Sequence, residues 1–292
     1  MTDDDRRSAV SGLRSAPDLA MAPSKPPTQG FGPAHVLEPH SGHSHTHTMV
    51  FLHGRGSGAE EFAEELMQAT LLSNGRSLQE ELPGWRWVFP AAREVWSEVF
   101  EEYMPMWFEL KDGGDGERDC EGLREAIGYV KGVLKEEKSR LRDGVVMLGG
   151  ISQGGAVGLW TVLSLMGDED GNNVGEWMGG FVGSSTWIPF GDEVDKILMA
   201  ADQVDGSVEQ MLGSLVHNHR HGSSIPILMG HGLDDAYVDV DLGRQASMIL
   251  KQVGCDVDWK EYRGAEQEGH WFKVPEQMDH IYDFMRRDMV KP

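Results

Sequence analysis

The residues best suited to do chemistry lie at 150–154, where the sequence has the pattern Gly-x-Ser-x-Gly around Ser152. An apolar run typical of a buried strand precedes this pattern, and a helical pattern follows it from Gln153 to Met166. A serine on such a strand-to-helix turn sits in a sharp bend, where the two glycines leave space that Cβ atoms would fill. Its hydroxyl then lies at a helix N-terminus, which favours negative charge. The pattern indicates a nucleophilic serine.

A serine nucleophile needs a base and an acid that orients the base. Asp234 and Asp235 follow one later apolar run, and His270 follows the next. Because the carboxyl ends of parallel strands meet at one edge of a sheet, we expect these residues near Ser152. His270 is the predicted base, and His231 is expected to brace a turn. The spacing alone does not separate Asp234 from Asp235.

The tetrahedral intermediate of acyl transfer also needs two N–H donors. One is expected from Gln153, directly after the serine. The other is expected from the glycine-rich loop at 52–58, which follows the first apolar strand. That loop could also be a plain tight turn. It lacks the Lys-Ser/Thr of a phosphate-binding loop and the spacing of a dinucleotide fingerprint, so the oxyanion interpretation is favoured.

Short apolar runs and helical patterns alternate along most of the chain. Strands are predicted at 48–52, 85–89, 145–148, 181–182, 225–229 and 257–262, and helices at 59–72, 118–139, 153–166, 241–253 and 275–289. Such alternation predicts an α/β fold with a mostly parallel central sheet and helices on both faces. We expect one catalytic domain over 35–292, after a disordered N-terminal tail over 1–34 that is rich in serine, proline and charge.

The charge balance limits the classes of partner. The chain has 26 Lys and Arg residues against 48 Asp and Glu, a formal net charge of −22. This charge disfavours a surface that neutralises nucleic-acid phosphates or docks on anionic lipid. No apolar run reaches the roughly 20 residues of a transmembrane helix, and the N-terminus does not read as a secretory signal. We therefore expect no integral membrane segment and a cytoplasmic location.

Metal and disulfide chemistry are not expected. Two cysteines are too few for a disulfide framework or a zinc cage. Five histidines lie between residues 35 and 47, three of them at a spacing of two. A solvated hairpin or a strand leading into the sheet is the favoured interpretation of this stretch, ahead of a metal site.

Five motifs in order along the chain resemble the phospholipase/carboxylesterase group of α/β-hydrolases, whose best-known members are the acyl-protein thioesterases. They are Leu-His-Gly-x-Gly at 52–56, Met-Pro-x-Trp-Phe at 104–108, Ser-Gln-Gly-Gly at 152–155, His-Gly-x-x-Asp-x-x-Val at 231–238 and Gly-His at 269–270. The resemblance implies the α/β-hydrolase fold and a reaction without cofactor or metal. It selects Asp235 as the acid and implies that backbone N–H groups of Arg55 and Gln153 form the oxyanion hole.

The chain departs from the family pattern where the substrate would bind. Arg55 stands where a small or apolar residue is usual, and Ser57 stands where the family usually has Asp. The segment between 186 and 224 is long and could form a lid over an acyl group, or an additional surface helix. Trp107, Phe108 and Trp187 are the predicted substrate-binding residues.

The resemblance implies a serine hydrolase that cleaves carboxylic esters or thioesters through an acyl-enzyme. Its substrates would be S-acylated proteins or lysophospholipids. A carboxylesterase of small molecules without a protein substrate is the alternative, which Arg55 favours. A third hypothesis is a non-catalytic binding protein of the same fold. The complete set of Ser152, Asp235 and His270 argues against it. The oligomeric state is left open.

Overall fold

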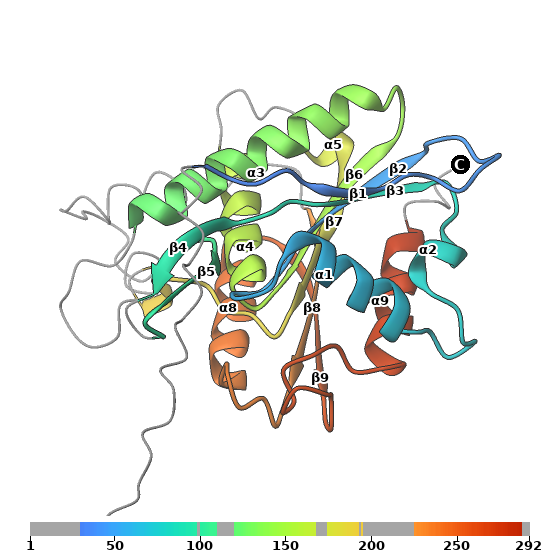
Figure 1. Ribbon diagram of the computed structural model, residues 1–292. Helices are drawn as coiled ribbons and strands as arrows, with labels where there is room; N and C mark the ends of the chain where they lie inside the picture. Colours follow the sequence, from blue (N-terminus) through green and yellow to red (C-terminus); the bar gives the residue numbers. More distant parts are fainter. Residues whose placement is uncertain are drawn as a thin grey trace, which may run out of the picture.

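The computed structural model describes residues 30–97, 100–109, 120–167, 174–192, 194 and 225–287 (Figure 1). Most of the tail predicted over 1–34 lies outside these residues, as does most of the segment at 186–224 that is predicted to form a lid or a surface helix. The boundary at residue 35 stays a prediction. No helix within the described ranges is both long and apolar enough to cross a bilayer.

A seven-stranded sheet with the order β1-β3-β2-β6-β7-β8-β9 forms the centre of the molecule. Its strands are β1 (His35–Leu37), β2 (His47–Leu52), β3 (Trp85–Phe89), β6 (Val145–Ile151), β7 (Met178–Ser184), β8 (Pro226–Gly232) and β9 (Asp256–Tyr262). β1 runs antiparallel to β3, and every other neighbouring pair is parallel. The predicted mostly parallel sheet is confirmed.

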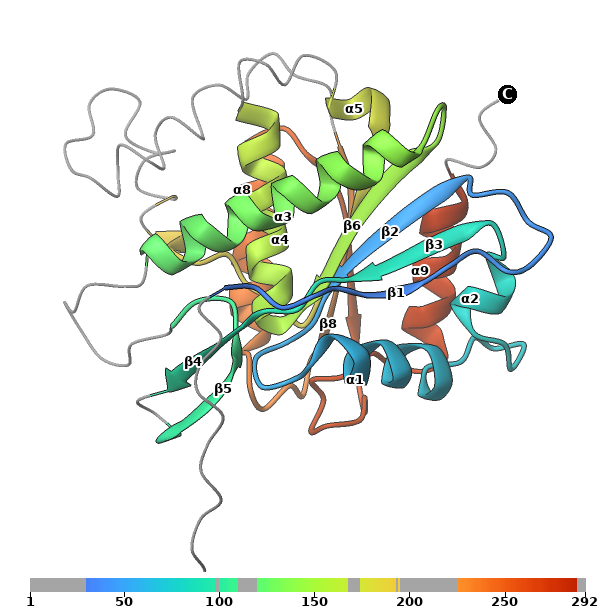
Figure 2. The ribbon, with the colours of Figure 1, turned by 45° about the horizontal axis from the view of Figure 1, so that its top comes forward.

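Helices cover both faces of this sheet (Figures 1 and 2). One face carries α3 (Cys120–Arg140), α4 (Ser152–Gly167) and α8 (Val240–Gln252); the other carries α1 (Ala59–Glu64), a π-helical turn η1 (Glu65–Ala69) and α9 (Glu276–Arg286). Neighbouring residues of β6 point to opposite faces, so that Leu148 joins the first apolar core and Met147 joins the second. Burial on both faces explains why the strands read as nearly continuous apolar runs.

Several elements differ from the prediction. The helix expected over 59–72 is α1 followed by η1, and it ends at Ala69. The strand expected at 181–182 is the longer β7, whose glycines dilute its apolar signal. Two short helices, α2 (Leu78–Glu81) and α5 (Val174–Trp177), are not predicted.

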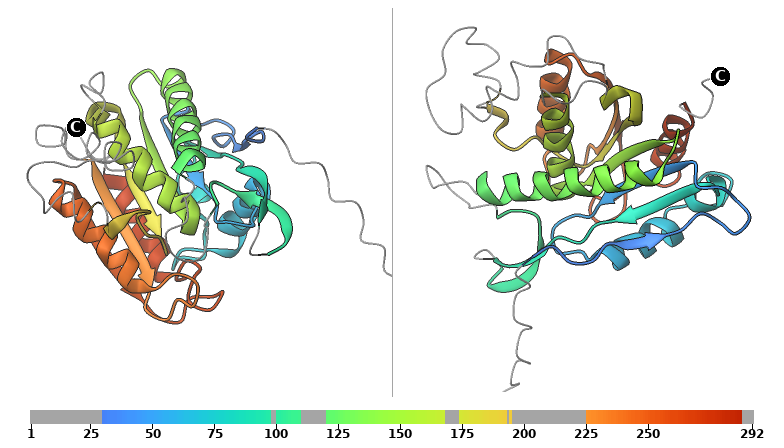
Figure 3. Two further views of the ribbon diagram at one scale, coloured as in Figure 1. Left: turned by 90° about the vertical axis from the view of Figure 1, so that its left-hand side faces the viewer. Right: turned by 90° about the horizontal axis from the view of Figure 1, so that it is seen from above.

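A separate hairpin of β4 (Arg93–Ser97) and β5 (Glu102–Met106) is also not predicted. Its two strands are mostly only partly buried, β4 begins with the charged residues Arg93 and Glu94, and β5 contains Pro105, which is unusual inside a strand. Figure 3 shows this hairpin standing away from the main sheet. After Met106, the last residue of β5, the chain continues into Trp107 and Phe108, which are buried in the main core.

The histidine-rich stretch leads into the sheet. His35 begins β1 and His47 begins β2, where its ring stacks on Trp85 at a centroid distance of 4.6 Å. His45 Nε2 lies 2.8 Å from Thr48 Oγ1. Among the residues that the structure describes, no three histidine, cysteine or acidic side chains are arranged so that they could hold a metal ion.

Candidate active site

Ser152 occupies a strained turn between β6 and α4. Its φ of +54° is unusual for a residue with a side chain and directs the backbone sharply from strand to helix. A Cβ atom on Gly150 would lie 2.5 Å from the backbone of Gly154, and one on Gly154 would lie 2.4 Å from the carbonyl oxygen of His53. Both contacts are with backbone atoms that cannot move aside. The spacing of the motif is therefore a steric requirement of this turn.

Two further contacts hold the turn in place. Thr186, just after β7, donates its hydroxyl proton to the carbonyl oxygen of Ser152 at 2.8 Å. The buried side chain of Gln153 accepts a hydrogen bond from the N–H of Trp107 at 2.9 Å and donates one to the carbonyl oxygen of Phe108 at 2.6 Å. The start of α4 is thereby tied to the end of the hairpin.

Asp235 and His270 form a hydrogen-bonded pair at the ends of β8 and β9. His270 Nδ1 lies 2.8 Å from Asp235 Oδ2. Asp235 Oδ1 also accepts hydrogen bonds from the backbone N–H groups of Tyr237 and Val238, both at 2.9 Å. Burial alone would raise the pKa of Asp235, but hydrogen bonds from His231, His270 and Val238 hold this pKa well below its usual range. The buried carboxyl group is therefore ionised and acts as an acceptor only.

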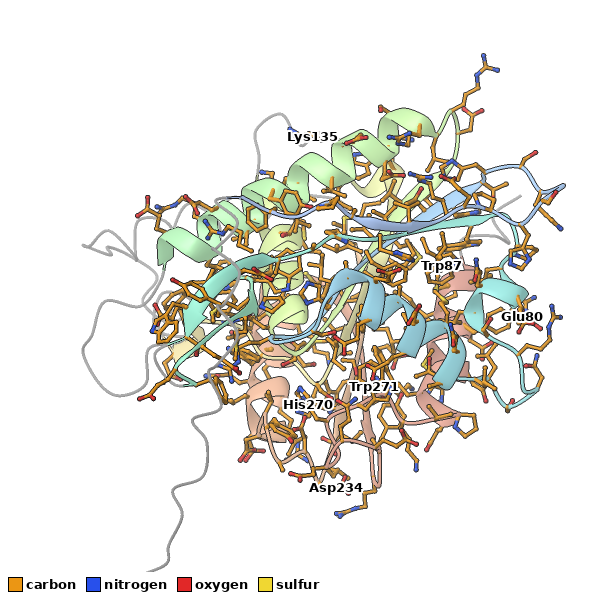
Figure 4. All side chains as sticks on the ribbon, viewed as in Figure 1. Glu80, Trp87, Lys135, Asp234, His270 and Trp271 are labelled. Atoms are coloured by element: carbon orange, nitrogen blue, oxygen red, sulfur yellow. The ribbon has the colours of Figure 1, made fainter. Side chains whose placement is uncertain are left out.

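The neighbouring histidine and aspartate have structural contacts. His231 is buried, and its Nε2 lies 2.9 Å from the carbonyl oxygen of Val238 and 3.3 Å from Asp235 Oδ2, as expected of a residue that braces the turn. Asp234 accepts hydrogen bonds from the N–H of Gly264 at 3.0 and 3.2 Å. Figure 4 shows Asp234 at the outer edge of this end of the molecule, with His270 farther in.

The loops that carry Asp235 and His270 fit closely together. A Cβ atom on Gly232 would lie 2.1 Å from the carbonyl oxygen of Gly269, so only glycine allows this approach. The N–H of Ala236 donates to the carbonyl oxygen of Glu268 at 3.1 Å. The ring of Tyr237 lies 5.3 Å from the ring of His270. Backbone contacts therefore set the position of Asp235 relative to His270.

Ser152 and His270 open into one pocket of about 350 Å³. Its other lining residues come from the glycine-rich loop, from α1 and η1, from the end of β6 and from the loop before α9: Gly54, Arg55, Gly56, Ser57, Glu61, Phe62, Glu65, Ile151, Gln267 and Trp271. The volume is in the range of small-molecule sites.

The two predicted oxyanion donors flank the serine. Gln153 follows Ser152 in the first turn of α4, where helical N–H groups have no acceptor within the helix. Arg55 lines the pocket, and its guanidinium lies 4.9 Å from the centre of the Phe100 ring. The loop that carries Arg55 is fixed by a 2.8 Å hydrogen bond from the N–H of Gly56 to the carbonyl oxygen of Pro105.

His53 is a positioning residue to which the sequence reasoning assigned no role. Its buried ring accepts a hydrogen bond from the N–H of Ala92 at Nε2 (3.1 Å), so that Nδ1 carries the proton and donates it to the carbonyl oxygen of Gly54 (2.8 Å). Its own carbonyl oxygen accepts from Trp107 Nε1 at 2.9 Å. Burial lowers the pKa of His53 to about 4, and the ring is therefore neutral. Its place in the Leu-His-Gly motif is the signal that could have indicated this role.

The three aromatic residues predicted to bind substrate do not line this pocket. Trp107 and Phe108 are buried in the core, and Trp187 packs against the same core. The pocket around Ser152 therefore has no wall formed by these three residues, and their role in substrate binding stays a prediction. Instead, the backbone of Trp107 and Phe108 holds the Gln153 side chain, so the Met-Pro-x-Trp-Phe motif supports the site from behind.

Comparison with known proteins agrees with the motifs. The model of the phospholipase/carboxylesterase family matches residues 34–196, more than half of the chain. Acyl-protein thioesterase 1 of Gibberella zeae is 27% identical over 253 residues, which cover 84% of this chain and 92% of that protein. A probable carboxylesterase SOBER1-like of Arabidopsis thaliana is 24% identical over 246 residues, covering 82% of this chain and 78% of that protein.

Solved structures show the same architecture. The crystal structure of acyl-protein thioesterase 2 of Zea mays matches with a TM-score of 0.64 at 24% identity, covering 89% of this chain and all (100%) of that one. Arabidopsis thaliana SOBER1 matches with a TM-score of 0.58 at 24% identity, covering 83% and 98% of the two chains. These likenesses confirm the predicted α/β-hydrolase fold.

Proposed function

The chain belongs to the phospholipase/carboxylesterase family of α/β-hydrolases, and we propose that it cleaves carboxylic esters or thioesters with Ser152 as its nucleophile. One observation carries the assignment of residues. Ser152, on its strained turn, and His270, hydrogen-bonded to Asp235, line the same pocket. A nucleophile, a base and an orienting acid are the parts that acyl transfer to serine requires.

The reaction proceeds in two acyl transfers. His270 takes the hydroxyl proton of Ser152 at Nε2 while the serine oxygen attacks the carbonyl carbon of the substrate. The tetrahedral intermediate expels an alcohol or thiol, which receives that proton from His270. Water then attacks the acyl-enzyme, again with His270 as base, and releases a carboxylic acid and free serine. Asp235 keeps the proton on Nδ1 of His270 and stabilises the imidazolium.

The backbone N–H groups of Arg55 and Gln153 are the proposed donors to the oxyanion. Two positions support this proposal. Gln153 lies at the start of α4, and Arg55 lines the pocket next to Gly54, which packs against Ser152. A donor of this kind contributes about 10²–10³-fold to the rate in related chemistry.

S-acylated proteins or lysophospholipids are the first substrate class we propose, on the strength of relatives named acyl-protein thioesterase. The alternative is a small-molecule carboxylesterase, supported by a relative with that name and by Arg55 in the pocket. Paired thioesters and oxyesters of increasing acyl length separate the two classes. A preference for long-chain thioesters supports the first, and equal turnover of short oxyesters supports the second. The predicted cytoplasmic location stays a prediction.

Replacing the nucleophile tests the assignment. Ser152→Ala should lower the hydrolysis of a short p-nitrophenyl ester by at least about 10³-fold and abolish labelling by a fluorophosphonate probe, because no hydroxyl remains to be acylated. Ser57→Ala is the matched control, since Ser57 also lines the pocket and should keep most of the activity. Substantial turnover by Ser152→Ala with an unchanged circular dichroism spectrum would refute the assignment.

A further inference from the structure

One wall of the pocket carries two carboxylates that the reaction does not use. Glu61 on α1 and Glu65, which begins η1, lie four residues apart on one helix face, and both line the pocket with Ser152. Like charges at this spacing repel each other. The pKa of Glu65 is raised, first by its partial burial and then by the charge of Glu61.

In the part of the chain that the structure describes, neither carboxylate takes part in an ion pair. Glu61 only accepts a 3.3 Å hydrogen bond from the N–H of Gly58. Arg55 lines the pocket too, but its guanidinium is placed over the Phe100 ring, beside the β4–β5 hairpin. The wall formed by α1 and η1 is therefore acidic.

This acidic wall adjoins the base. Phe62, between the two glutamates, packs edge-on against Trp271 with ring centroids 6.0 Å apart, and Trp271 follows His270 directly. Both rings line the pocket. In the proposed reaction His270 returns its proton to the departing alcohol or thiol, so the leaving group lies on the side of the pocket where His270 and the α1 wall meet.

We propose that Glu61 and Glu65 select substrates whose departing alcohol or thiol carries an ammonium group within a few bonds of the scissile carbonyl. The inference rests on the proposed function and adds to it the charge of the leaving group. Two carboxylates attract such a cation, and a primary or a quaternary ammonium group satisfies this requirement.

A pair of thioesters of the same shape isolates the charge. Acetylthiocholine carries a quaternary ammonium group, and 3,3-dimethylbutyl thioacetate has a neutral carbon in its place. The released thiol is measured with a chromogenic disulfide, and the ratio of kcat/KM for the two substrates is compared among variants. The comparison among variants cancels any intrinsic difference in reactivity between the two thioesters.

The double variant E61Q/E65Q should lower this ratio about tenfold, and each single variant about threefold, as expected for charges in partly solvated surroundings. The matched control is E60Q/E64Q, which makes the same charge change on the same helix at exposed residues outside the pocket lining. Its ratio should change by less than about twofold. In the wild-type protein, raising the ionic strength from 0.01 to 0.5 M should also reduce the preference.

An unchanged ratio in E61Q/E65Q overturns the inference. An equal loss with both thioesters also overturns it, because the carboxylates would then act on His270 or on the fold. These results leave the proposed function intact, since the neutral thioester is still hydrolysed and Ser152 is still labelled by a fluorophosphonate. Wild-type protein that neither hydrolyses the neutral thioester nor takes the label would instead refute the proposed function.

Discussion

Asp234 and Asp235 are neighbours of the same residue type with different environments. Asp235 is buried against His270 and receives two backbone hydrogen bonds, whereas Asp234 is on the outside and closes the loop to Gly264. The difference arises from a turn in which the N–H of Asp235 bonds to the carbonyl oxygen of Gly232. Only one of the two carboxylates can orient the base.

Substituting each aspartate in turn tests this assignment. In Asp235→Asn the amide oxygen can still accept from Tyr237 and Val238, but the amide NH₂ faces His270 and favours the wrong tautomer. We expect kcat to fall by about 10³–10⁴-fold. Asp234→Asn keeps an acceptor for Gly264, and its kcat should stay within about twofold of wild type. Steady-state kinetics with a p-nitrophenyl ester give both values, and similar losses in the two variants would contradict the assignment.

The nucleophile and the base could be proposed from the sequence because the types, the order and the distance from strand ends of Ser152 and His270 are all readable along the chain. The choice of Asp235 needed the resemblance to a known family, since neighbouring loop residues have no periodicity to separate them. The role of His53 depends on contacts with Ala92 and Trp107, which are distant in the sequence. The Leu-His-Gly motif draws attention to His53, but it does not show these two contacts.

Among the elements, helix α4 is sterically constrained at its start. It begins at Ser152, and its first glycine, Gly154, packs against the end of β2 with no space for a methyl group. The longer helix α3 also contains glycines, but a Cβ atom on Gly132 would meet no heavy atom within 4 Å. Glycine is thus sterically required at position 154 of α4, whereas position 132 of α3 has space for a larger residue.

Alanine at these two positions should change stability in opposite directions. Gly154→Ala places a Cβ atom 2.4 Å from a backbone oxygen, and we expect it to destabilise the protein by about 3 kcal/mol or more. Gly132→Ala, on an exposed helix surface, should stabilise it by about 0.5–1 kcal/mol. Urea unfolding followed by circular dichroism measures both effects. A Gly154→Ala protein as stable as wild type would contradict the steric explanation.

Elements with a continuous apolar run or a strong helical period could be predicted, and those without could not. β2, β3 and β6 are buried on nearly every residue and are therefore visible in the sequence. β4 begins with two charged residues and β5 contains Pro105, so the partly exposed hairpin is not recognisable as a pair of strands. The period of α1 shows that Phe62 faces the core, but it cannot show that Glu61 and Glu65 face a pocket.

At the scale of the whole molecule, the chain brings the ends of β2, β6, β8 and β9 to one edge of the sheet, and the candidate site lies there. The alternation of strands and helices predicts this edge, because parallel strands end on the same side. The strand order β3-β2-β6 is not readable from the sequence, since it depends on which strands meet during folding. His53 follows β2 at this edge and is hydrogen-bonded to Gly54, Ala92 and Trp107.

The neutral state of His53 should make the stability of the whole protein depend on pH. Its pKa in the folded protein is about 4, below the value of 6.5 for a free side chain. The unfolded chain therefore binds more protons between these values, and the free energy of unfolding falls as the pH falls through this window. The contribution of neutral His53 to the free energy of unfolding is complete well above pH 6.5. At about pH 5.5, one unit below the pKa of the free side chain, this contribution should be smaller by about 1.4 kcal/mol.

His53→Gln supplies the comparison, because its side chain does not titrate. The variant should be less stable than wild type at pH 7.5, and the difference in unfolding free energy should narrow by about 1.4 kcal/mol at pH 5.5. Both pH values are above the isoelectric point of about 4.8. Urea unfolding at the two pH values gives the result, and a difference that does not change with pH would contradict a neutral His53.

The close fit between Gly232 and Gly269 also affects the timing of catalysis. Because the two loops touch through their backbones, Asp235 and His270 are aligned before any substrate arrives. The loss of orientational entropy that this alignment requires thus occurs once, when the protein folds, and it is not repeated in each catalytic cycle. A substrate that enters the pocket has only its own position to fix.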